Sequence, residues 1–169
     1  MKIRNIATVY VFNEDKILLM HRVGSRLFSG SIWVGIGGHF EPDEACAPTV
    51  CALRELREET GLLEEDISPP RLRYITTRLV GDEIRQQYIF TAMLKNKFAA
   101  LTTSDEGELH WIPLTELFLR KHAFSNEHCL RHYLASGGSS NEVFAACVSE
   151  NESGLYVQIT ALKEYSNNH

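Results

Sequence analysis

Three glutamates in the first half of the chain stand at spacings of three and four residues: Glu55, Glu58 and Glu59. On a helix this spacing brings all three carboxylates to one face, where neighbouring like charges repel each other. We expect a helix over 48–60, because it would begin at a proline, which suits a first helical turn, and Gly61 suits the left-handed residue that ends a helix. A cation held against this face would offset the repulsion, so the spacing indicates a cation site.

The rest of the pattern predicts an α/β fold with a mixed sheet. β-Branched and aromatic residues predict strands over 3–12, 16–22, 32–36, 71–80, 84–94 and 108–112. Further along the chain, we expect helices over 115–120 and 126–135, followed by a hairpin of 143–148 and 155–162. Asn126 is expected to be the N-cap of its helix. Strands and helices alternate irregularly and include hairpins, which predicts a mixed sheet covered by helices. We expect one domain over 1–169, with the hairpin as an extension at about 141–165.

Two consecutive glycines, Gly37 and Gly38, follow the apolar segment 32–36. Without a Cβ, this turn lets backbone approach a ligand closely. Mg²⁺ prefers oxygen ligands in near-octahedral geometry and keeps some of its water. The glycines and the glutamate helix together predict a floor that holds metal ions against phosphate oxygens, where a metal would activate a water.

Bulk properties exclude several kinds of partner. The formal net charge is -5, which argues against binding a nucleic-acid polymer, since that requires a basic surface. The N-terminus has no apolar signal-type stretch, and the apolar segment 8–12 is too short to span a bilayer. The four cysteines form no CxxC pair and are expected to be reduced thiols. We therefore expect a cytoplasmic protein without a membrane partner.

The combined pattern resembles the Nudix box, G-x5-E-x7-R-E-U-x-E-E-x-G-U, in which U is aliphatic. Gly38 and Glu44 match its first part, and 54–62 matches the remainder. One departure is that nine residues, instead of seven, separate Glu44 from Arg54, which we interpret as a lengthened loop or an added turn. The resemblance implies a Nudix-type α/β/α sandwich with a mixed central sheet, to which this chain adds the C-terminal β-hairpin.

The resemblance also implies a magnesium-dependent hydrolase that cleaves the pyrophosphate link of a nucleoside diphosphate derivative, with Mn²⁺ as a substitute metal. Glu58 and Glu59 correspond to the principal metal ligands, assisted by Glu55 and the Gly37 carbonyl. The other implied site residues orient the box (Arg54, Glu44), add a further ligand or general base (Glu106) or bind phosphate (Arg22, Arg26). Separately, Phe28 is a candidate for stacking on the base.

Several alternatives stay open from sequence. An oxidised nucleoside triphosphate, cleaved to monophosphate and diphosphate, is the first substrate candidate, and ADP-ribose or a dinucleoside polyphosphate is the second. A third interpretation is a Nudix domain that senses a nucleotide without cleaving it. The carboxylates could also form a solvated face on which Glu58 pairs with Arg54. Finally, the hairpin is a candidate for a homodimer interface or a substrate lid.

Overall fold

The computed structural model describes residues 1–24, 30–102, 105–136 and 140–162. Its strands are β1 (Lys2–Asn13), β2 (Lys16–Val23), β3 (Ser31–Val34), β4 (Ile36–His39), β5 (Arg71–Val80), β6 (Glu83–Met93), β7 (Glu108–Pro113), β8 (Phe144–Asn151) and β9 (Gly154–Ala161). The helices are α1 (Pro48–Thr60) and α2 (Phe124–Ala135), with short 3₁₀ turns at Pro42–Glu44, Glu64–Asp66 and Leu114–Leu119. Among these residues, no helix combines the length and the apolar character needed to cross a membrane.

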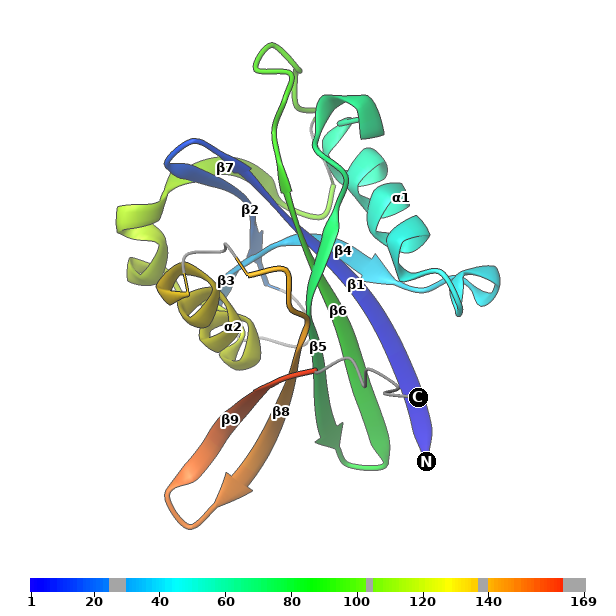
Figure 1. Ribbon diagram of the computed structural model, residues 1–169, viewed down its shortest axis with the longest axis vertical. Helices are drawn as coiled ribbons and strands as arrows, with labels where there is room; N and C mark the ends of the chain where they lie inside the picture. Colours follow the sequence, from blue (N-terminus) through cyan, green and yellow to red (C-terminus); the bar gives the residue numbers. More distant parts are fainter. Residues whose placement is uncertain (25–29, 103–104, 137–139, 163–169) are drawn as a thin grey trace, which may run out of the picture.

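The described strands join into one mixed sheet in the order β3-β2-β1-β6-β5-β8-β9, with β4 paired to β1 and β7 paired to β2. The β1–β6 and β5–β8 pairs are parallel, whereas the other pairs are antiparallel. The C-terminal hairpin therefore extends the main sheet through β8, as Figure 1 shows.

Alternate residues of β1 enter two separate hydrophobic layers. Val9 and Val11 pack in the layer that contains Leu56 of α1. Tyr10 and Phe12 point to the opposite face and pack in the layer that contains Leu130 of α2. Because successive side chains of a strand point to opposite faces, the two helices cover opposite sides of the sheet (Figure 1). The predicted α/β/α sandwich with a mixed sheet is confirmed.

The segment 32–36, predicted as one strand, forms two strands divided at Gly35. β3 pairs with β2, whereas β4 pairs with β1, so the chain changes partner at this glycine. A Cβ on Gly35 would lie 2.6 Å from a side-chain carbon of Thr8 and 2.7 Å from one of Tyr10. The crossing between strands is thus close enough to require a residue without a side chain.

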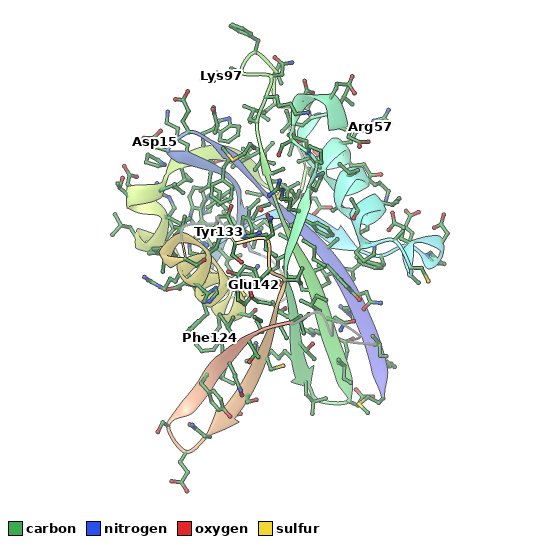
Figure 2. The ribbon with its side chains drawn as sticks, viewed as in Figure 1. Asp15, Arg57, Lys97, Phe124, Tyr133 and Glu142 are labelled. Atoms are coloured by element: carbon green, nitrogen blue, oxygen red, sulfur yellow. The ribbon has the colours of Figure 1, made fainter. Side chains whose placement is uncertain are left out.

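The two later helix predictions differ in their details. The segment 115–120, predicted to be helical, forms a 3₁₀ helix over Leu114–Leu119. α2 begins at Phe124 with Ala123 as its N-cap, so Asn126 is not the cap but a first-turn residue, only 6% exposed. Figure 2 labels Phe124 and Tyr133 near the two ends of this helix. Burial of Asn126 explains the error, because a capping pattern in sequence does not reveal which polar side chain faces the interior.

Candidate active site

A cavity of about 440 Å³ lies on the face of the sheet that α2 covers. Its walls come from β1 to β6, the loop before β7 and the start of α2, and one side chain of α1 reaches it. Of the residues predicted from sequence, Arg22, Gly37, Glu55 and Glu106 line it. The structure thus brings together residues that are up to 84 positions apart in the chain, counting from Arg22 to Glu106.

The two glycines of β4 allow close approach on different sides, Gly37 to the backbone of β1 and Gly38 to Glu55 of α1. A Cβ on Gly37 would lie 2.0 Å from the backbone oxygen of Ala7. A Cβ on Gly38 would lie 2.4 Å from Oε1 of Glu55. Glycine at the second position therefore leaves the space through which the Glu55 carboxylate reaches the cavity from the far side of the sheet.

Arg54 connects the glutamates of α1 to the preceding loop. Its Nε and Nη2 donate to the two carboxylate oxygens of Glu44 at 2.8 and 2.9 Å. Its Nη1 donates to Glu55 at 2.8 Å and to Glu58 at 3.0 Å. The guanidinium thus ties one loop carboxylate and two helix carboxylates together, and this includes the i, i+4 pair expected of a solvated helix face.

The two extra residues ahead of α1 leave this contact intact. A 3₁₀ turn ends at Glu44, and the backbone N–H of Ala47 donates to the Glu44 carbonyl at 2.8 Å, which adds a turn before the helix. The Glu44 carboxylate is buried and also accepts from the backbone N–H of Glu41. Hydrogen bonding from Arg54 is the main reason that the pKa of Glu44 falls to about 2, so this carboxylate is ionised at neutral pH.

Glu59 is the most enclosed of the three helix glutamates, with a relative exposure of 4%. It accepts a hydrogen bond from the backbone N–H of Gly37 at 2.9 Å and contacts Nη2 of Arg22 at 3.4 Å. Burial raises the pKa of Glu59 to about 7, although the Gly37 and Arg22 contacts oppose this rise. The carboxylate is therefore short of positive charge, the condition that a bound cation relieves.

Arg22 links Glu59 to the loop that precedes β7. Its guanidinium forms an ion pair with Glu106, and both side chains line the cavity. Arg22 thus lies between the glutamate helix and a second acidic loop, where it faces the space that a substrate would fill. Arg26 and Phe28, the other predicted substrate-binding residues, lie outside the described residues.

The donor set suits a hard divalent cation. Among the described residues, no three acidic, histidine or cysteine side chains converge into a ready-made metal cage. Mg²⁺ does not require one, because it binds through one or two carboxylates, substrate phosphates and retained waters. The buried Glu59 carboxylate, with its raised pKa, and the nearby Glu55 carboxylate fit such a site. In this structure the Glu55 and Glu58 carboxylates both accept a hydrogen bond from Nη1 of Arg54.

The cavity is also lined by residues that no pattern along the chain singles out. Arg78 of β5 and Arg85 and Gln87 of β6 line it, together with Asn126 of α2. The alternation within β5 and β6 indicates that these side chains share a face. Only the pairing of β6 with β1, however, brings that face beside the glycines of β4.

Comparisons with known proteins agree with this geometry. Residues 1–133 match the model of the NUDIX domain. A mutator MutT protein from Bacillus halodurans has a TM-score of 0.67 at 21% identity, over 92% of this chain and 97% of that one. A Nudix hydrolase from Nitrosomonas europaea has a TM-score of 0.69 at 18% identity, over 87% of this chain and 79% of that one. An Ap4A hydrolase from C. elegans has a TM-score of 0.63 at 16% identity, over 83% of this chain and 100% of that one. At these identities the likeness shows a common fold.

Proposed function

This chain belongs to the Nudix family of pyrophosphohydrolases, and we propose that it hydrolyses the pyrophosphate link of a nucleotide in a reaction that depends on magnesium. The observation that carries the proposal is the Glu59 carboxylate, which is buried against the Gly37 backbone beside a cavity of nucleotide size. A buried carboxylate with its pKa raised to about 7 is a group that a divalent cation stabilises.

In this proposal Glu58 and Glu59 are the principal metal ligands, and Glu55 and the Gly37 carbonyl assist them. Bound Mg²⁺, or Mn²⁺ in its place, would neutralise phosphate charge and lower the pKa of a coordinated water. Glu58 supports this role because its side chain is 57% exposed and can turn from Arg54 toward a ligand.

The remaining roles concern orientation and charge. Arg54 holds the loop through Glu44, so the proposed ligands keep their places when substrate arrives. Arg22 offers its guanidinium to a substrate phosphate in exchange for its contacts with Glu59 and Glu106. Glu106 then becomes available as a further ligand or as the general base, a role supported by its position in the cavity wall.

The proposal extends to three substrate groups, which are oxidised nucleoside triphosphates, ADP-ribose and dinucleoside polyphosphates. The Ap4A hydrolase among the similar structures supports the third. We also propose that the chain acts as one cytoplasmic domain. Its thiols at Cys46, Cys51, Cys129 and Cys147 form no disulfide in the structure, which is consistent with a reducing compartment.

We further propose that two copies associate along β9. This strand pairs only with β8 among the described residues, and its Leu155 and Tyr156 side chains are 41% and 42% exposed. An unpaired strand edge is a ready template for a second chain. Sedimentation of the purified protein tests this proposal, and a monomer at all concentrations would contradict it.

A hydrolysis screen tests the function. The protein with Mg²⁺ is incubated with canonical and oxidised nucleoside triphosphates, ADP-ribose and diadenosine polyphosphates, and the products are identified. We expect turnover of at least one group, and a loss of at least 100-fold in kcat for Glu58→Gln with substrate binding retained.

Glu65→Gln is the matched control for this variant, because Glu65 is an exposed glutamate outside the cavity. It should retain full activity. Nucleotide binding by the unmodified protein without turnover of any substrate would contradict the enzyme and favour a sensor.

A further inference from the structure

Three arginines form a row across the sheet at the end of the cavity away from the glycines. Arg4 of β1 lies opposite Arg85 of β6, and Arg85 lies opposite Arg78 of β5. Side chains of directly paired residues share a face, and Arg85 and Arg78 both line the cavity. Like charges opposite one another on neighbouring strands destabilise a sheet, so this row requires negative charge nearby.

One carboxylate supplies part of that charge. Glu83 accepts from Nε of Arg4 at 3.0 Å and from Nε of Arg85 at 2.7 Å. Among the described residues, no carboxylate forms an ion pair with Arg78. Glu83 therefore pairs with two of the three guanidinium groups, in a protein whose formal net charge is -5. This end of the cavity is locally cationic.

The row stands at a defined distance from the proposed reaction centre. Gly37 lies opposite Thr8 of β1, four residues along the strand from Arg4. At about 3.3 Å per residue, the arginine row lies roughly 13 Å from the glycines. This span is comparable with the length of a nucleoside 5′-phosphate. Between the two ends, Ile6 and Gln87 form the cavity floor, and the Gln87 amide donates to the Thr8 hydroxyl at 2.8 Å.

We propose that Arg78 and Arg85 bind a second phosphate group of the substrate, held about one nucleoside's length from the pyrophosphate that is cleaved. The inference rests on the proposed function for the position of that pyrophosphate. The second phosphate belongs either to the ribose, at its 2′ or 3′ oxygen, or to the far end of a polyphosphate chain. Both sources present the same chemistry, a phosphate that accepts hydrogen bonds from a guanidinium fork.

The test is a set of equilibrium binding measurements, which need no turnover. Isothermal titration compares AMP with adenosine 2′,5′-bisphosphate and adenosine 3′,5′-bisphosphate, and compares ATP with adenosine 5′-tetraphosphate. We expect the additional phosphate to tighten binding about tenfold in one of these arms, and the arm identifies its source. In Arg78→Gln the ratio of the two affinities should fall to about one, because this substitution removes the guanidinium that pairs with no carboxylate among the described residues.

Arg71→Gln is the matched control, since Arg71 is an exposed arginine of the same strand that does not line this cavity. It should keep the full advantage. Equal affinities within every pair, absence of binding by all five nucleotides, or an advantage that survives in Arg78→Gln would each overturn the proposal. Hydrolysis in the substrate screen together with equal affinities would overturn this inference while leaving the proposed function intact.

Discussion

Single residues of the Nudix box determine where the carboxylates of the site lie. Gly38 has no Cβ, and this allows the Glu55 carboxylate to lie where a methyl group would stand. Arg54 spreads its donors over Glu44, Glu55 and Glu58. The glycine and the arginine therefore determine where carboxylates lie without needing to contact the substrate.

Gly38→Ala should displace Glu55 from the cavity wall. The added Cβ would lie 2.4 Å from Oε1 of Glu55, so the carboxylate must move although the fold can remain. We expect a fall of at least tenfold in kcat/KM with a change in unfolding free energy of about 1 kcal/mol. Steady-state kinetics and urea unfolding measure the two quantities, and unchanged kinetics would contradict the assigned role of Gly38.

Glu44→Gln should destabilise the protein in a manner that depends on pH. The folded-state pKa of Glu44 is lowered from 4.5 to about 2, so its stabilising contribution is present above pH 4.5 and is lost as the pH falls toward 2. At pH 7 we expect the variant to lose about 2 kcal/mol of unfolding free energy. Urea unfolding between pH 7 and pH 3 should show this difference shrinking, and a constant difference would contradict the ionic contribution.

The elements place these side chains. α1 ends at Gly61, whose φ of +76° is left-handed and whose N–H donates to the Arg57 carbonyl at 2.9 Å. The helix starts at Pro48, as expected, and it presents Leu56 to the sheet and Glu55 to the cavity. β4 is only four residues long, yet its Gly38 allows the close approach of Glu55 from α1.

Gly61→Ala should weaken the end of α1. A Cβ at this position meets a left-handed backbone and would lie 2.7 Å from the methyl carbon of Thr102. We expect a loss of about 1–2 kcal/mol in unfolding free energy, measured by urea unfolding. Gly81→Ala is a useful comparison because Gly81 is also left-handed, at φ +63°, but has open space around it. Equal losses in the two variants would show that contact with Thr102 contributes nothing.

The sheet as an assembly joins distant segments into one cavity. The glutamate helix approaches from one face, whereas the cavity lies on the other, and the short strand β4 is the place where the two meet. A cation bound there would connect α1 to the sheet, so metal binding and global stability should be coupled.

Mg²⁺ should therefore raise the melting temperature. At ten times its dissociation constant, a ligand that binds only the folded state adds about 1.4 kcal/mol, which is a shift of about 4 °C for a chain of this size. Differential scanning calorimetry with Mg²⁺ and with a chelator measures this shift. We expect Glu59→Gln to lose the shift and Glu65→Gln to keep it. A shift of equal size in Glu59→Gln would argue against Glu59 as a ligand.

Local sequence determined much of the site and of its elements. The helix bounds of α1 and the family followed from capping residues and spacing within one continuous segment, because such contacts act over a few positions. The division of 32–36 at Gly35 could not be predicted, since it depends on Thr8 and Tyr10 packing from another strand. The cap prediction for Asn126 fails for the same reason, because the burial of this side chain depends on the sheet beneath α2.

Only the tertiary structure decided the far end of the cavity. Arg4, Arg78 and Arg85 show no pattern along the chain, and they form a row solely because β1, β6 and β5 pair in one register. Strand pairing between distant segments depends on packing across the entire sheet, whereas helix caps and carboxylate spacing are local. The glutamates thus indicated the kind of bond that we propose is cut, and the sheet brought together the arginines that we propose bind the rest of the substrate.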